Sequence, residues 1–269
     1  GAGYKVGPRT LNELGAEVIT IGCSPNGRNI NHGCGSTQPE LLQKTVAAVE
    51  AEVGIALDGD GDRVVMVDEL GELLDGDQLI YIIATARKSE GALMGPVVGT
   101  VMSNLGLEQA LKAMEVDFHR TPVGDRHVLD MLMQQGWTLG GETSGHIICL
   151  EHTTTGDGII SALQVVTELF MSGRPLHELK SGMTKLPQRL VNVRVEPGFD
   201  FKNAPGVREA LGAVEAELGG GGRVLLRASG TEPLVRVMIE GTDAAQVEAL
   251  ANRLAAAISE AHQAFCADA

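Results

Sequence analysis

Two short apolar runs, 55–57 and 64–67, enclose a segment in which three aspartates alternate with glycines. Runs of this composition predict buried strands, so the acidic segment is expected to form a tight loop at a strand's end. In such a loop Asp58, Asp60 and Asp62 can direct their oxygens toward one point, where their repulsion would be costly without a hard divalent cation. The sequence therefore predicts a Mg²⁺ site formed by these three carboxylates.

Three other interpretations of this loop compete with the magnesium site. An acidic surface turn is disfavoured, because three aspartates between buried strands are a costly way to make a turn. An EF-hand would use Asp58, Asp60, Asp62 and Glu69, but it needs glycine where Arg63 stands, and it needs helical flanks. An aspartyl-phosphate phosphatase, with Asp58 as the nucleophile and Asp60 as the acid, remains open as the enzymatic alternative.

Composition limits the partners and the compartment. With 269 residues, 43% of them hydrophobic, the chain is long enough for two or three domains. Its net charge of −14 argues against nucleic acid or an anionic membrane as a partner, and leaves small phosphorylated metabolites possible. Four cysteines without paired short spacing disfavour zinc and disulfides: Cys23, Cys34, Cys149 and Cys266. Without a signal peptide or a membrane-spanning stretch, we expect a cytoplasmic protein.

The first third of the chain predicts an α/β layer with a parallel sheet. Its expected elements before the acidic loop are a helix at 4–14 closed by Gly15, a strand at 17–22, a polar loop at 24–38 and a helix at 39–53. Because this pattern opens with a helix, we expect that the first strand of the sheet is missing from these residues. After the acidic loop, Asp75 and Asp77 precede a helical run at 78–88 and are expected to be helix caps rather than metal ligands.

A second α/β unit is expected from about residue 91. Its strands are predicted at 97–102, 116–119, 137–140 and 147–150, and its helices after Ser103 or Asn104, at 125–135 and at 157–171. Strands and helices that alternate in this way form an open sheet. The polar loop Glu142 to His146 would lie at strand ends, where such sheets bind ligands.

After a linker at 182–188 the pattern changes to a separate α+β domain. Its predicted elements are strands at 189–195, 223–227 and 234–239, a helix at 206–218, a Gly-rich turn at 219–222 and a final helix. The core face of that helix comprises Val247, Leu250, Ala251, Leu254 and Ile258. The predicted fold is thus two open mixed-sheet α/β/α domains, 1–88 (incomplete) and 89–184, followed by a smaller α+β domain, 185–269.

Between two strands of this last domain lies a segment rich in hydrogen-bond donors. It holds two arginines, two hydroxyls and a glycine: Arg227, Ser229, Gly230, Thr231 and Arg236. Two guanidinium groups with hydroxyl and backbone N–H donors suit phosphate oxygens. A plain hairpin turn, the alternative, needs neither two hydroxyls nor two arginines, so a phosphate site is favoured.

Three separated stretches resemble one family, the α-D-phosphohexomutases. The segment Asp58 to Arg63 resembles its metal loop, Gly141 to His146 its sugar-recognition loop, and Arg227 to Pro233 with Arg236 its phosphate loop. Two more stretches, Asn29 to Thr37 and Thr121 to Arg126, resemble the family's bacterial phosphoglucosamine mutase branch. The resemblance covers the whole chain.

The resemblance implies a mutase that interconverts glucosamine 6-phosphate and glucosamine 1-phosphate through a 1,6-bisphosphate, with Mg²⁺, and supplies UDP-N-acetylglucosamine synthesis. It implies small phosphosugar partners and a possible homodimer. The family has four domains and carries its catalytic phosphoserine in the first, in a Ser-His-Asn-type loop that these residues do not contain. We therefore expect that the chain starts late in the second domain and is inactive alone.

The resemblance also implies a role for each site residue. Asp58, Asp60 and Asp62 would hold Mg²⁺, with the phosphoserine as the fourth ligand, and Arg63 would contact the phosphoryl group in catalysis. Glu142 and Ser144 would bind sugar hydroxyls, whereas His146 is expected to be a strand-start residue satisfied locally. The phosphate that is not reacting would be held by Arg227, Ser229, Gly230, Thr231 and Arg236.

Three functional alternatives remain beside this mutase. The chain could belong to another phosphohexomutase, such as a phosphomannomutase or phosphoglucomutase. It could be a phosphosugar-binding module without turnover, or the aspartyl-phosphate phosphatase described above.

Overall fold

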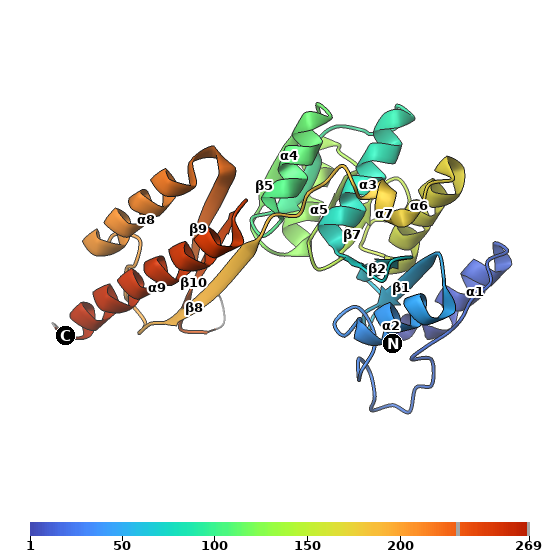
Figure 1. Cartoon of the computed structure of the whole chain (residues 1–269), viewed down its shortest axis with the longest axis horizontal. Coiled ribbons are helices and arrows are strands. Elements are labelled where there is room, and N and C mark those ends of the chain that lie inside the picture. The colour runs from blue at the N-terminus through green and yellow to red at the C-terminus, as the bar shows by residue number, and fades with distance from the viewer. Residues whose placement is uncertain (230–231, 268–269) are drawn as a thin grey trace. The chain divides into compact units, whose positions relative to one another are not determined.

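The computed structural model describes residues 1–229 and 232–267 (Figure 1). The chain divides into two compact units, Gly1–Thr184 and Lys185–Ala269. None of the helices in the described ranges has both the length and the apolar character needed to cross a membrane.

The first unit begins with helical segments around a long irregular loop. A 3₁₀ turn, η1 (Ala2–Tyr4), leads into α1 (Val6–Glu13), and Gly15 follows with a φ of +92°. The next helix, α2 (Glu40–Val49), ends at Glu50, which is left-handed. The strand predicted at 17–22 is wrong: none of the described strands pairs with this segment, and without a partner an apolar run has no ladder to join.

The acidic loop connects two strands of an antiparallel sheet. Its strands are β1 (Val53–Leu57), β2 (Val64–Asp68) and β3 (Leu73–Leu74), in that order. The parallel sheet expected here is therefore wrong for these strands. The six residues between Leu57 and Val64 can close a hairpin, whereas a parallel crossover needs a dozen or more residues.

The rest of the first unit is the expected open mixed sheet. Its strands are β4 (Val97–Thr100), β5 (Phe118–Thr121), β6 (Leu139–Gly141) and β7 (Ile147–Cys149), in the order β5-β4-β6-β7 with only β7 antiparallel. The helices are α3 (Gly76–Ser89), α4 (Leu105–Ala113), α5 (Asp125–Gln135), α6 (Gly158–Ser172) and α7 (Leu176–Leu179). Asp75 caps α3 as predicted, with a capping box that includes Gln78.

Helices cover both faces of this sheet. On one face Val98 and Ile148 pack with Val128 and Leu132 of α5. On the other face a larger cluster joins the sheet to α3, α4 and α6. The three α/β/α layers follow from strand alternation, because neighbouring residues such as Val97 and Val98 face opposite sides.

The second unit is the smaller α+β domain. Its elements are β8 (Gln188–Arg194), α8 (Pro205–Leu218), η2 (Gly219–Gly221), β9 (Gly222–Ala228), β10 (Leu234–Gly241) and α9 (Ala244–Ala267). The strands form an antiparallel sheet in the order β8-β10-β9. The predicted core face of the last helix is confirmed, because all five of its apolar residues are buried: Val247, Leu250, Ala251, Leu254 and Ile258.

Candidate functional site

The loop between β1 and β2 brings its three aspartates together. Ligand atoms of Asp58, Asp60 and Asp62 all lie within 4.8 Å of one another. Asp58 is 4% exposed, and its Oδ1 accepts hydrogen bonds from the backbone N–H groups of Gly61 at 3.0 Å and Arg63 at 3.2 Å. These bonds close a tight turn around Asp58 and direct the loop's carboxylates inward.

Two buried carboxylate oxygens of this loop lie beside a guanidinium group. Asp58 Oδ2 and Asp62 Oδ1 accept no hydrogen bond from the described residues, but both are within ion-pair distance of Arg63. The nearest charge is Arg63, whose Nε lies 2.7 Å from Asp58 Oδ2 and 3.6 Å from Asp62 Oδ1. A cluster of carboxylate oxygens without nitrogen or sulfur donors fits a hard divalent cation.

Local electrostatics distinguish the buried Asp58 from the half-buried Asp62. Burial acts to raise the pKa of Asp58, but the N–H groups of Arg63 and Gly61 and the Arg63 charge hold it below its usual value. Burial and the neighbouring Asp58 raise the pKa of Asp62. Although burial opposes it, the pKa of Arg63 is raised by Asp58 and Asp62. The loop thus keeps Asp58 ionised and Arg63 firmly protonated.

His146 stands at the start of a strand as expected, with β7 beginning at Ile147, but the expectation that its side chain is satisfied locally is wrong, because its partner is distant in sequence. His146 Nδ1 is hydrogen bonded to Asp62 Oδ2 at 2.9 Å, and the residue is only 5% exposed. A Cβ added to Gly156 would lie 2.4 Å from ring atoms of His146, so the glycine makes room for the imidazole. The sequence signal that was available is the position of His146 in the same polar loop as Glu142.

Backbone contacts attach that polar loop to the metal loop. Val64 N donates to Gly145 O at 3.0 Å, and Arg63 forms a β-bridge with His146. Within the loop, Glu142 N donates to His146 O and Gly145 N to Glu142 O, both at 2.9 Å. The candidate sugar and metal residues of the first unit are therefore held in one rigid arrangement.

The two predicted sugar-binding side chains differ in their surroundings. Ser144 is exposed, at the tip of the tight turn. Glu142 Oε1 accepts a hydrogen bond from Gly124 N at 2.9 Å, which joins the loop to the segment Thr121 to Arg126. One carboxylate oxygen of Glu142 is thus used for local structure, and the other is available to a ligand.

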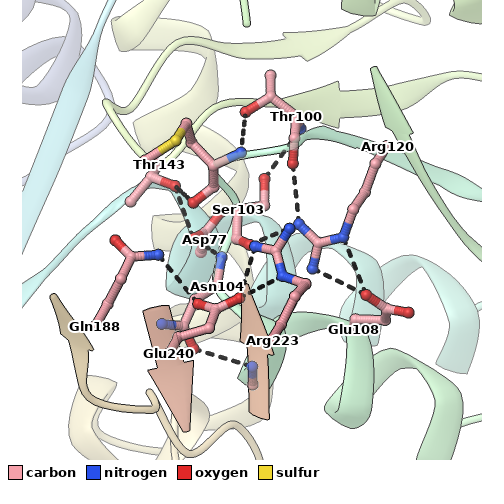
Figure 2. A network of polar contacts seen from close by, with 12 residues as sticks. Asp77, Thr100, Ser103, Asn104, Glu108, Arg120, Thr143, Gln188, Arg223 and Glu240 are labelled. Atoms are coloured by element: carbon pink, nitrogen blue, oxygen red, sulfur yellow. Dashed lines mark hydrogen bonds and ion pairs between the residues drawn. The ribbon is translucent and has the colours of Figure 1, made fainter. Parts of the chain in front are cut away.

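A polar network connects the loop at 141–146 to the segment that precedes α4 (Figure 2). Asp77 Oδ2 accepts from Asn104 N and from Thr143 Oγ1, both at 2.8 Å. Arg120 Nη1 donates to Ser103 O at 2.6 Å, and Arg120 also pairs with Glu108 at 2.9 Å. Asp77 therefore braces Thr143 and the start of α4, which is a structural role beyond the helix cap expected for it.

The second unit contains the predicted anion-binding residues. Arg227 on β9 and Arg236 on β10 are directly opposite in the sheet, so their side chains share one face. Arg227 Nε, Arg236 Nε and Ser229 Oγ are buried without hydrogen-bond partners in the described part of the chain. Gly230 and Thr231, also predicted here, lie outside the described residues.

The positive charges of Arg227 and Arg236 repel each other at this site. Burial and the Arg236 charge lower the pKa of Arg227. The nearest acidic atom recorded for Arg236 is Glu232 Oε2, at 3.8 Å from its Nη2. Two facing cations with unused donors are an unfavourable arrangement unless an anion binds between them.

The predicted resemblance to the phosphohexomutase family is confirmed by family models. The phosphoglucomutase/phosphomannomutase models match the chain at residues 1–71 (α/β/α domain II), 75–186 (α/β/α domain III) and 190–257 (C-terminal domain). The chain belongs to this family.

The chain is similar along almost its whole length to family members that are named phosphoglucosamine mutase. The chain is 56% identical over 264 residues to a phosphoglucosamine mutase of Methylococcus capsulatus, covering 98% of this chain and 59% of the relative. It is also 56% identical over 268 residues to a phosphoglucosamine mutase of Halorhodospira halophila, again covering 59% of the relative. The chain thus spans about three fifths of the length of the curated relatives it matches.

A solved structure agrees with this fold. N-acetylphosphoglucosamine mutase of Aspergillus fumigatus, in complex with GlcNAc-6P and magnesium, superposes with a TM-score of 0.73 at 25% identity. The match covers 94% of this chain and 64% of the fungal chain.

Proposed function

We propose that this chain carries the metal, sugar and phosphate sites of a phosphoglucosamine mutase, which interconverts glucosamine 6-phosphate and glucosamine 1-phosphate through a 1,6-bisphosphate. The observation that carries the proposal is the identity of 55–58% to proteins named phosphoglucosamine mutase over at least 95% of this chain. The phosphoserine of the reaction comes from outside these 269 residues, so the activity belongs to a longer assembly.

At the metal loop, Asp58, Asp60 and Asp62 hold Mg²⁺, which polarises the phosphoryl group when bound. The convergence of three carboxylates, whose ligand atoms lie within 4.8 Å of one another, supports this assignment. Arg63 contacts the transferred phosphoryl group, and its raised pKa keeps the positive charge in place for that contact. His146 orients Asp62 through the bond between their side chains.

The remaining residues bind the parts of the substrate that do not react. Glu142 and Ser144 accept or donate hydrogen bonds to sugar hydroxyls. Arg227, Ser229, Gly230, Thr231 and Arg236 hold the second phosphate, so binding energy away from the chemistry orients the reacting end. Because the bisphosphate must turn around between the two half-reactions, this clamp accepts a phosphate at either end of the sugar.

The domain organisation and setting belong to the same proposal. The three functional domains are 1–88 with the metal loop, 89–184 with the sugar loop and 185–269 with the phosphate loop. The protein works in the cytoplasm as part of amino-sugar metabolism, with phosphosugars as its small-molecule partners.

The test is a comparison of ligands on the 269-residue chain by calorimetry with Mg²⁺ present. Glucosamine 1,6-bisphosphate should bind more tightly than glucosamine 6-phosphate, and glucosamine should bind weakest, because each phosphate adds charge-assisted contacts. Mannose 6-phosphate is the specificity control. Equal affinity for mannose and glucosamine 6-phosphates would favour a general phosphohexomutase, and equal affinity for glucosamine itself would refute the phosphate clamp.

A further inference from the structure

The strand β9 has an edge that pairs with no strand among the described residues, since it is last in the order β8-β10-β9. At its end, Ser229 N donates to Leu234 O at 2.8 Å, which fixes the alternation of the β9–β10 ladder. By that alternation Arg227 is bonded to Arg236, while Val224 and Leu226 direct their N–H and C=O groups to the open edge.

The side chains of the same two residues line a cavity. It has a volume of about 290 Å³ and lies between β9 and α8, which pack beside each other (Figure 1). Val224 and Leu226 form one wall, and Val207 and Leu211 of α8 form the other. Arg227 faces the opposite side of the strand, so this groove is separate from the proposed phosphate site.

Two cationic residues and one acidic residue border the groove. Lys202, just before α8, and Arg208, in its first turn, lie at one end, and Glu215 lies seven residues further along the helix. All three are exposed, and none forms an ion pair within 4.0 Å in the described ranges. In a chain with a net charge of −14, Lys202 and Arg208 place two exposed cations at the border of one groove, which suits an acidic ligand. Lys202 also acts on Asp200, whose pKa is lowered by its hydrogen bond with Asn203 and by the Lys202 charge.

We propose that this groove binds a short extended peptide segment of another protein, which pairs with β9 as an added antiparallel strand. An apolar side chain of the peptide enters the cavity, and an acidic side chain two positions away meets Lys202 and Arg208. Alternate side chains of a strand are about 6.7 Å apart on one face, so one segment reaches both. The outward N–H and C=O groups of Val224 and Leu226 favour a peptide backbone over a small molecule.

A second copy of this chain fits the groove less well than a foreign segment. In a β9–β9 pair, Val224 and Leu226 of the second copy are already packed against their own α8 core. They have no apolar side chain free to enter the cavity of the first copy.

The probe is a fluorescein-labelled hexapeptide of sequence Thr-Asp-Thr-Val-Thr-Leu, titrated into the 269-residue chain and followed by anisotropy. Arg208→Glu should weaken binding about tenfold at low salt, since one charge-assisted contact becomes repulsive. Arg189→Glu, a reversal on β8 outside the groove, is the matched control and should change nothing. A peptide with lysine in place of its aspartate should prefer the Arg208→Glu variant, and equal binding of both peptides to both proteins would overturn the proposal.

Two N-methylated peptides test the added strand itself. In antiparallel pairing the N–H of the peptide's valine faces β9, so methylating it should abolish binding. Methylating the threonine that follows, whose N–H points away from β9, should leave binding intact. Unchanged binding of both methylated peptides would exclude strand pairing. Sedimentation velocity without peptide tests whether the chain associates with itself. If self-association is lost in Arg208→Glu but kept in Arg189→Glu, the open edge of β9 binds a second copy of this chain, and the proposal of a foreign peptide is wrong.

Discussion

Asp60 differs from the other carboxylates of its loop because it is exposed, whereas Asp58 is buried and Asp62 is half-buried. Its substitution therefore tests metal binding with little effect on folding. We predict that Asp60→Asn weakens Mg²⁺ binding about tenfold, because one of three charged ligands becomes neutral. Calorimetric titration measures this, with the exposed Asp117→Asn as the control. Equal affinities in wild type and Asp60→Asn would remove the metal assignment.

Substitution of Arg236 tests phosphate binding in the second unit. Arg236→Ala should reduce the affinity for glucosamine 6-phosphate by about 1.5–3 kcal/mol, the value of a charge-assisted contact. Binding of unphosphorylated glucosamine should not change. Because the substitution also removes the repulsion with Arg227, the melting temperature should not fall. Arg189→Ala serves as the control, and an equal loss for both ligands would make the loop structural.

At the scale of elements, the hydrogen bond between the 141–146 loop and β2 depends on a glycine. Gly145 has a φ of +93°, and a Cβ added to it would lie 2.0 Å from Val64 O. We predict that Gly145→Ala destabilises the first unit by about 2–4 kcal/mol, through backbone strain and this collision. Gly91→Ala is the matched control, because Gly91 has a φ of +68° with nothing within 4 Å, and its cost should be about 1 kcal/mol.

Urea unfolding followed by tryptophan fluorescence measures both variants. Trp137 is the only tryptophan in the sequence and belongs to the first unit, so its signal reports that unit alone. Equal costs for the two alanine variants would show that the contact with Val64 does not constrain the loop.

Local signals made most elements predictable. The helix at 125–135 was predicted with the bounds of α5, which ends at Gly136 in the left-handed conformation, and Asn104 caps α4 as its side chain suggested. The errors concern pairing over distance. The segment 17–22 has strand composition without a partner, and β1 and β2 pair as a hairpin although their apolar runs are typical of parallel strands.

The candidate site shows the same division between local and distant information. The clustering of Asp58, Asp60 and Asp62 follows from spacing within one loop, and the opposition of Arg227 and Arg236 follows from one hairpin. The contact of His146 with Asp62 joins residues 84 positions apart, and nothing in local pattern specifies it.

At the scale of the whole molecule, a charged cluster gives the first unit a pH dependence. His177 of α7 is hydrogen bonded to Glu69, and Lys180 of the same segment lies 2.5 Å from the buried Asp68 and 2.6 Å from Glu72. The bond with Glu69 raises the pKa of His177 above its ordinary 6.5. Burial acts to raise the pKa of Glu69, but the His177 interaction holds it below its ordinary 4.5.

The directions of these two pKa shifts determine the pH range in which the cluster stabilises the first unit. The His177 contribution is complete below pH 6.5 and is lost as pH rises through its raised folded pKa, whereas the Glu69 contribution is lost as pH falls below 4.5. We predict that stability, measured by Trp137 fluorescence, decreases from pH 6 to pH 9 and that His177→Gln reduces this decrease. His152→Gln, at an exposed histidine, should leave it unchanged. The same pH profile in wild type and His177→Gln would contradict the prediction.

An experiment on the 269-residue chain also separates the mutase from the phosphatase alternative. If the nucleophile is a serine outside these 269 residues, incubation with Mg²⁺ and glucosamine 1,6-bisphosphate should produce neither turnover nor a covalent adduct, even though the ligand binds. If Asp58 were an aspartyl nucleophile, the same mixture would give a hydroxylamine-labile phosphoprotein and release inorganic phosphate. The structure favours the first outcome, because Asp58 Oδ1 is held by two backbone N–H groups and Oδ2 lies beside Arg63. Intact-protein mass spectrometry decides between them, and a phosphoryl group on Asp58 would refute the mutase proposal.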